Sequence, residues 1–182
     1  MLFRLEPEAI VMIVPVLLFS LTVHEFAHAF AAFRLGDDTA QRAGRLTLNP
    51  LAHLDPIGTL MLFLVGFGYA KPVPINIRNL KRPRRDDSII AAAGPLSNLM
   101  MAIVVGLALR FSFPALMGAL RSDPGNASLI QAVVSMGIYA TMINLALCVF
   151  NSLPVYPLDG SHVMENSLPV GKAMKFRESA RY

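Results

Sequence analysis

Residues 9–33 read AIVMIVPVLLFSLTVHEFAHAFAAF and contain a single charged side chain, Glu25. A helix rises about 1.5 Å per residue, so this run would reach roughly 37 Å, enough to cross the hydrocarbon core of a bilayer. Two further runs, residues 89–109 and 128–150, contain no charged residue and are also long enough. The sequence therefore predicts three transmembrane helices.

The composition agrees with a protein that is solvated by lipid. Of the 182 residues 54% are hydrophobic and 15% are charged, and the mean hydropathy is +0.53, whereas soluble proteins carry about 25% charged residues. The 16 Lys and Arg lie between the apolar runs and form no basic face, so we expect no nucleic-acid partner. The single cysteine, Cys148, excludes an internal disulfide and a cysteine-based metal site. Any metal would be bound by His, Asp or Glu.

A fourth apolar stretch, residues 57–70, has only 14 residues, three of them glycine. A stretch of this length is more often re-entrant or buried than spanning, so we expect a re-entrant hairpin, with a short fourth membrane segment as the alternative. With a hairpin, nine Lys or Arg between residues 34 and 88 and four in the tail lie on one side of the membrane, and only Arg121 lies in the loop 112–127 on the other. The positive-inside rule then predicts a multi-pass protein of the cell membrane, with the N-terminus outside and the C-terminus in the cytoplasm.

Residues 69–79, YAKPVPINIRN, alternate apolar residues with proline and polar residues. This pattern predicts an edge strand, because proline cannot donate a hydrogen bond in a central ladder. The predicted fold class is an all-α integral membrane protein, in which residues 1–182 form a single domain. That domain has a three-helix transmembrane core, a re-entrant hairpin or short fourth segment, and a small β-strand element.

The chemistry of the sequence begins inside the first predicted span, at HEFAH, residues 24–28. At 100° per residue His24 and His28 lie about 40° apart on one helix face and one turn apart along the axis, so both imidazoles can reach one metal. Glu25 lies about 60° from His28, where it can address a metal-bound water without being a ligand. Zinc in such a site keeps one open position and lowers the pKa of its water to about 7. Ionisable groups in lipid cost at least a few kcal/mol each, which favours a functional role for all three.

A zinc site of this kind needs a third protein ligand, and the candidates are His53, Asp55 and Asp159. No glutamate follows shortly downstream of HEFAH, which removes the pattern in which such a residue completes the site. Asp159 is favoured, because the third span would return the chain to the membrane depth of the two histidines. His53 and Asp55 lie in a Pro-flanked loop, where polar side chains more often hold their own backbone.

Three motifs in order connect the sequence to a known family: HEFAH at 24–28, GPLSN at 94–98, and N-x-x-P-x-x-x-x-D-G at 151–160. Together they resemble the site-2 protease family of intramembrane zinc metalloproteases. The stretches NPLAHLDPIGT at 49–59 and AKPVPIN at 70–76 resemble its compact prokaryotic branch, which lacks a PDZ domain. The resemblance covers about residues 15–165.

The resemblance implies a three-helix transmembrane core with the active site toward the cytoplasm. It also implies a role for each motif residue. His24, His28 and Asp159 would bind one Zn²⁺ per chain, Glu25 would be the general acid/base, Asn151 would hold the oxyanion, and Asn98 would line the catalytic cavity.

The sequence departs from the family at its C-terminal end. Proteins of this family usually carry further apolar sequence after the DG motif, whereas residues 161–182 are short, basic and too polar to span a membrane. We therefore expect either a minimal branch of the family or a truncated chain.

The function predicted from these residues is hydrolysis of peptide bonds in or near transmembrane segments of membrane-protein substrates. Residues Pro72, Val73, Pro74, Ile75 and Asn76 would bind the unwound substrate by strand addition. The lipid bilayer is the second expected partner, and a homo-oligomer is left open. The alternative is a metal-binding membrane protein without hydrolysis, a transporter or an inactive scaffold. Glu25 favours the protease, because a transporter needs ligands but no free carboxylate beside the metal.

Overall fold

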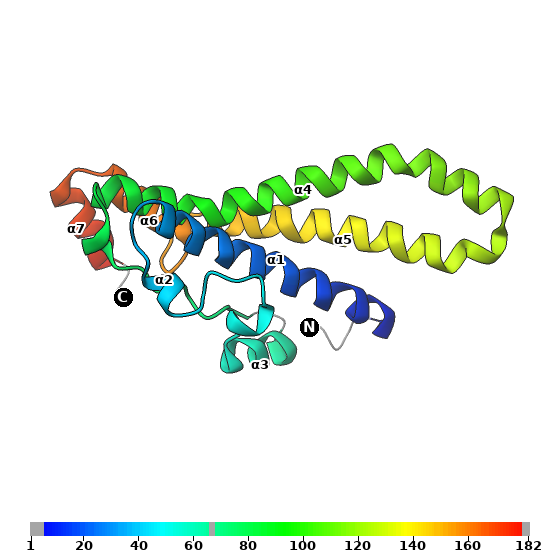
Figure 1. The fold of residues 1–182 in the computed structure, drawn as a ribbon, viewed down its shortest axis with the longest axis horizontal. Coiled ribbons are helices and arrows are strands. Elements are labelled where there is room, and N and C mark those ends of the chain that lie inside the picture. Colours follow the sequence, from blue (N-terminus) through cyan, green and yellow to red (C-terminus); the bar gives the residue numbers. More distant parts are fainter. Residues whose placement is uncertain (1–5, 66–67, 180–182) are drawn as a thin grey trace.

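The computed structural model describes residues 6–65 and 68–179. Its α-helices and short 3-10 helices follow one another along the chain (Figure 1). They are α1 (Pro7–Arg34), α2 (Thr39–Arg42), η2 (Pro50–Ala52), α3 (Pro56–Val65), η3 (Ile77–Asn79), α4 (Pro83–Ser122), η4 (Pro124–Asn126), α5 (Ala127–Asn151), α6 (Asp159–Ser167) and α7 (Val170–Ser179).

Three of these helices, α1, α4 and α5, are long and apolar enough to cross a membrane, which confirms that expectation. α4 and α5 form a long antiparallel hairpin, and α1 lies beside the half of the hairpin nearer to α6 and α7 (Figure 1). α4 continues well beyond the predicted span, because the first strong turn signal after residue 109 is Asp-Pro-Gly at 123–125. Asp123 caps this turn by accepting a hydrogen bond from the backbone N–H of Gly125.

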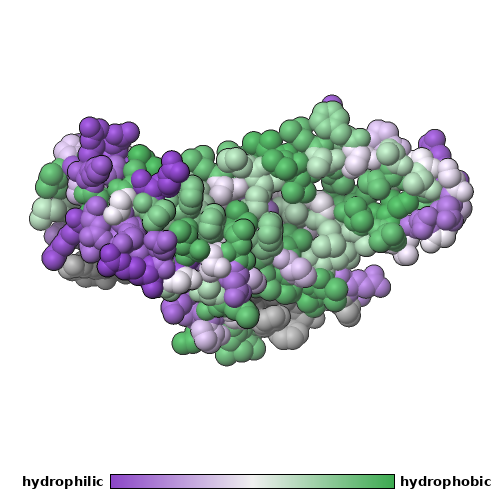
Figure 2. Space-filling model, in the orientation of Figure 1, coloured by the Kyte–Doolittle hydropathy of each residue, from purple (hydrophilic) through white to green (hydrophobic). Residues whose placement is uncertain are grey.

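The distribution of polarity is inverted relative to a water-soluble domain. Ser20, Asn98 and Asn144 are almost fully buried between the three long helices, whereas Met100 and Phe111 are among many large apolar side chains exposed on α4 and α5. Figure 2 shows this apolar surface extending over the long helices, with hydrophilic residues gathered at the two ends. Large contiguous apolar surface of this kind is rare on soluble monomers, and polar side chains are typical contacts between membrane helices.

The stretch predicted as a hairpin or a fourth segment contains one short helix, α3, which is only 10 residues or roughly 15 Å long. Leu54, which precedes this stretch, and Ala70, its last residue, pair in an antiparallel bridge, so the two ends of the stretch lie close together. Residues 66–67 lie outside the described residues. Neither the hairpin nor the fourth membrane segment is confirmed, and the choice between them stays a prediction.

The strand predicted over residues 69–79 is not confirmed. The described part of this stretch contains only the isolated bridge at Ala70, and its last three residues form η3, whose first turn is capped by the Asn76 side chain. The physical reason is that a strand needs a neighbour: Pro72 and Pro74 donate no hydrogen bond, and no second strand lies alongside in the described structure. Proline also disfavours helical backbone at the residue before it, here Lys71 and Val73.

Candidate metal centre

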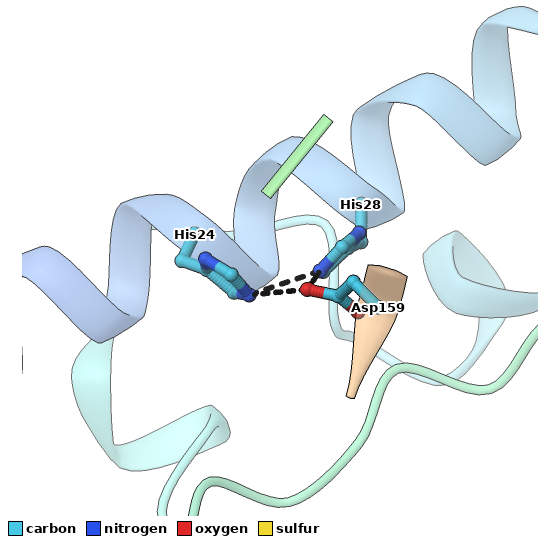
Figure 3. Close-up of side chains that lie close together, drawn as sticks. All are labelled: His24, His28 and Asp159. Carbon is cyan, nitrogen blue, oxygen red and sulfur yellow. Dashed lines mark hydrogen bonds and ion pairs between the residues drawn. The ribbon is translucent and has the colours of Figure 1, made fainter. Parts of the chain in front are cut away.

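His24 and His28 lie one turn apart on α1, on the face that packs against α4, and both are buried. Their Nε2 atoms are 3.1 Å apart. Figure 3 shows the two imidazoles converging on the carboxylate of Asp159, which comes from the other end of the chain. The predicted i, i+4 geometry therefore brings both ring nitrogens to one point.

The other nitrogen of each imidazole is fixed by a hydrogen bond. The Nδ1–H of His24 donates to Oδ1 of Asn98 at 2.6 Å, and the Nδ1–H of His28 donates to the backbone carbonyl of Ile90 at 2.7 Å. A neutral imidazole carries one proton, so each Nε2 is left with its lone pair. Two lone pairs thus face each other across a buried gap.

Asp159 is the first residue of α6, and its carboxylate supplies the third candidate ligand atom. Its Oδ2 lies 3.2 Å from Nε2 of His24 and 3.4 Å from Nε2 of His28, and it has no hydrogen-bond partner. A carboxylate that binds a metal must be deprotonated, so Asp159 would act as an ionised ligand.

These three atoms fit a zinc ion. Zinc at about 2.0 to 2.1 Å from tetrahedral ligands holds those ligands about 3.3 to 3.5 Å apart, close to the separations between the Nε2 and Oδ2 atoms. All three are electron-pair donors, and a cation between them satisfies all of them at once. Within the described residues this is the one group of three His, Cys, Asp or Glu side chains able to share a metal.

Two glycines allow the three ligands to meet. A Cβ atom on Gly94 of α4 would lie 2.4 Å from Nε2 of His28 and 2.6 Å from Nε2 of His24, inside the metal site itself. A Cβ atom on Gly160 would lie 2.3 Å from the carbonyl oxygen of Ser152. Gly94 therefore leaves room for the metal, and Gly160 lets α6 begin directly against the end of α5.

A buried polar chain supports His24 from the far side. The Oδ1 of Asn98 accepts the hydrogen bond from His24, and its Nδ2 donates a hydrogen bond to Oδ1 of Asn144 on α5 at 2.8 Å. Asn144 donates in turn to Oγ of Ser20 on α1 at 2.9 Å. These side chains link the three long helices, and they fix the orientation of the Asn98 amide and hence the protonated nitrogen of His24. Outer partners of this kind orient a metal ligand.

Glu25 and Asn151 were predicted to act beside the metal. Glu25 is buried next to His24 on α1, with 9% of its surface exposed. Asn151 is the last residue of α5, and its Nδ2 donates to the carbonyl of Leu147 in its own helix. Asn151 and Asp159 line one largely apolar cavity of about 420 Å³ between α4, α5 and α6. The oxyanion role of Asn151 stays a prediction.

The other candidate ligands lie outside this cluster. His53 is buried against the carbonyl of Thr47, to which its Nε2–H donates at 2.8 Å. Asp55 caps α3, where its Oδ1 accepts hydrogen bonds from the backbone N–H groups of Ile57 and Gly58. Both side chains hold their own loop. The stretch predicted to bind substrate, residues 72–76, lies next to this loop, and Lys71 donates to the carbonyl of His53.

Sequence reasoning missed several residues that build the site. Gly94 is part of the GPLSN motif, but its role was not predicted, because that role depends on how closely α4 approaches α1. Asp87 on α4 accepts hydrogen bonds from Nδ2 of Asn166 at 2.6 Å and from Nδ1 of His162 at 3.3 Å, which ties α6 to α4. One signal was available: Asn144 is an amide within a charge-free span, where polar residues are costly.

Comparisons with known proteins agree with this chemistry. The chain is 40% identical over 171 residues to "Putative zinc metalloprotease YwhC" of Bacillus subtilis, covering 91% of this chain and 73% of that protein. It is 32% identical to "Putative zinc metalloprotease Rip2" of Mycolicibacterium smegmatis and 33% identical to the Rip2 of Mycobacterium tuberculosis, and spans 55% and 58% of their lengths. No family model and no solved structure matches. On the strength of the first relative, the chain belongs to the zinc metalloprotease family that includes YwhC.

Proposed function

We propose that this protein is an intramembrane zinc endopeptidase of the site-2 type, which cleaves peptide bonds in or near transmembrane segments of membrane proteins. The observation that carries the proposal is the position of the three donor atoms of His24, His28 and Asp159. Two of these residues lie within a helix apolar enough to span a membrane. A hydrolytic centre on such a helix acts on chains that are themselves in the membrane.

Zinc held by His24, His28 and Asp159 would supply a water of lowered pKa and polarise the substrate carbonyl. The Glu25 carboxylate would act as general base and then, as general acid, would protonate the leaving amine. The Asn151 amide, which lines the same cavity as Asp159, donates to the carbonyl oxygen as negative charge develops there. Asn98 keeps the protonated nitrogen of His24 turned away from the metal throughout.

A peptide in an intact helix has no accessible carbonyl, because each one is hydrogen-bonded within the helix. The substrate therefore unwinds locally, and we propose that residues 72–76 bind it in extended form by strand addition. Backbone hydrogen bonds of this type require no particular substrate sequence.

We further propose the orientation that the basic residues favour, with the metal centre toward the cytoplasm and residues 57–70 as a re-entrant hairpin. The bridge between Leu54 and Ala70 supports the hairpin, because it brings both ends of this stretch to one place.

Glu25→Gln tests the chemistry. The variant keeps the shape of the side chain but removes the base, so we expect full zinc occupancy and a fall in cleavage of a membrane-embedded peptide by roughly 10² or more. Zinc is measured by elemental analysis, and cleavage is measured in vesicles. Glu8→Gln makes the same change on an exposed position of the same helix and serves as the control.

If zinc-loaded Glu25→Gln protein cleaved the peptide at the wild-type rate, Glu25 would not be the general base. The transporter would be favoured over the protease by two results together: the wild type cleaves no transmembrane substrate, and Glu25→Gln changes the flux of zinc across the membrane.

A further inference from the structure

We propose that Arg45 and Asp37 are positioning residues for the substrate, because they clamp the backbone of residues 71–76 at its two ends. The clamp leaves one edge, with the N–H groups of Val73 and Ile75, free for an extended peptide. This inference rests on the proposed function and deepens it, since it assigns the side chains that prepare the substrate-binding edge.

Arg45 holds the first end. Its guanidinium donates from Nη1 to the carbonyl of Pro72 at 3.2 Å and from Nη2 to the carbonyl of Lys71. Nη2 also lies 3.4 Å from Nδ1 of His53, which is an acceptor because the Nε2–H of His53 donates to Thr47. Only 5% of the Arg45 surface is exposed, so its contacts are made inside the protein and not with solvent.

Asp37 holds the second end. Its side chain is fully buried, and its Oδ2 accepts the backbone N–H of Asn76 at 2.7 Å. Its Oδ1 accepts the side-chain amide of Asn79 at 2.8 Å and the hydroxyl of Thr39 at 2.5 Å. Burial raises the pKa of Asp37, but these hydrogen bonds lower it to below its usual value. The acceptor is therefore an ionised carboxylate.

Asp37 connects the clamp directly to the metal helix. Gly36 has φ +107°, a left-handed conformation that favours glycine. The N–H of Gly36 donates to the carbonyl of Phe33, and the N–H of Asp37 donates to the carbonyl of Ala32. This C-terminal cap fixes Asp37 to the end of α1, the helix that carries His24 and His28. The held segment is thereby positioned relative to the metal centre.

The clamp leaves backbone groups between its two ends unpaired. Arg45 holds the carbonyls of Lys71 and Pro72, and Asp37 holds the N–H of Asn76. Pro72 and Pro74 have no N–H to leave unpaired. The backbone groups of Val73 and Ile75 have no hydrogen-bond partner among residues 6–65 and 68–179, so their N–H groups are available to an extended peptide.

Packing prevents the segment from turning over. The Ile75 side chain packs against a buried cluster that consists of Ala32 of α1, Leu80 after η3, and Ile90 of α4. Since Ile90 also accepts the hydrogen bond of His28, the free edge and the metal ligands rest on the same group of residues. An edge that is fixed before binding loses less conformational freedom when a peptide pairs with it.

The test compares Arg45→Met with Arg42→Met and Asp37→Asn with Asp38→Asn. Arg42 and Asp38 are neighbours in sequence that pair only with each other on the surface in the described structure. We expect Arg45→Met and Asp37→Asn to raise KM for a membrane-embedded peptide by about tenfold or more, with kcat changed by less than about threefold and zinc content unchanged. Arg45→Lys, which retains the charge, should recover part of the loss.

Amide hydrogen exchange provides a readout that does not depend on activity. In the wild type the backbone amide of Asn76 should be protected from exchange, while the backbone amides of Val73 and Ile75 exchange rapidly. Asp37→Asn should abolish the protection of the Asn76 backbone amide. Equal KM values for Arg45→Met and Arg42→Met in an active wild type would overturn this inference alone. A wild type that cleaves no membrane peptide would overturn the proposed protease function, and this inference with it.

Discussion

At the scale of single residues, the site is determined as much by what is missing as by what is present. Gly94 of α4 faces the two imidazoles, and any side chain there would occupy the space between the ligand atoms. His24 and His28 supply two candidate ligand atoms, but α4 can approach them only if one of its residues has no side chain. A helix glycine normally costs about 1 kcal/mol relative to alanine, and here that cost maintains the metal site.

We expect Gly94→Ala to abolish stoichiometric zinc binding, because the new methyl group would lie 2.4 Å from Nε2 of His28. Gly118→Ala is the matched control, since it makes the same change in the same helix where no atom lies within 4 Å. The control should bind zinc fully and gain up to about 1 kcal/mol in stability. Zinc content by elemental analysis separates the two variants, and equal occupancy would show that Gly94 does not limit the site.

The residues also show how far sequence alone reaches into a site. His24, Glu25 and His28 are one local pattern, so their relative placement follows from helix geometry without any tertiary information. Gly94 and Asn144 act across helix interfaces, and their roles depend on distances that no local pattern encodes.

At the scale of elements, the placement of Asp159 depends on how α6 is held. Asp87 of α4 binds His162 and Asn166, one and two turns into the helix that Asp159 begins. Arg84 of α4 adds hydrogen bonds to the carbonyls at the C-terminal end of α6. The third candidate ligand is therefore aligned by contacts at the opposite end of its own short helix.

The hydrogen bond that His162 donates to the Asp87 carboxylate raises the pKa of His162 above its ordinary value, although burial opposes this shift. Because the pKa of His162 is higher in the folded protein than in the unfolded chain, its protonation stabilises the folded state. This stabilisation is complete at pH values below the unfolded pKa of about 6.5, and it is lost as the pH rises through the folded pKa. The carboxylates of Asp159 and Glu165 act on His162 in the same direction. We expect the Tm difference between wild type and His162→Gln to be largest below pH 6.5 and to shrink toward alkaline pH. A difference that grows with pH would contradict the ion pair.

The elements were predicted unevenly. The three long helices follow from apolar runs, because each run is a local property of the chain. The predicted span ends at residue 109 because Arg110 interrupts the apolar run, whereas helix α4 continues to the Asp-Pro-Gly turn. The strand at 69–79 is not confirmed for a different reason: its alternation is local, but a strand exists only if another one lies beside it.

At the scale of the whole molecule, one arrangement serves both stability and chemistry. The apolar exterior of α1, α4 and α5 suits lipid, and the polar residues between them bind one another and the candidate zinc ligands. The metal site joins α1 to α6, elements from opposite ends of the chain, so a bound zinc would also stabilise the fold. The polar interior and the candidate metal centre are thus the same part of the molecule.

The orientation of this arrangement in the membrane gives the last prediction. If residues 57–70 return to the side they left, Arg42 and Arg78 face one compartment and Arg121 faces the other. All three are exposed, so single cysteines at these positions in a Cys148→Ser background are accessible to a membrane-impermeant thiol reagent. We expect Arg42→Cys and Arg78→Cys to be labelled from the cytoplasmic side and Arg121→Cys from the outside. Labelling of Arg42→Cys and Arg78→Cys from opposite sides would mean that residues 57–70 cross the bilayer. Since Asn76 is held by Asp37 at the end of α1, that result would also contradict the close packing of these two segments.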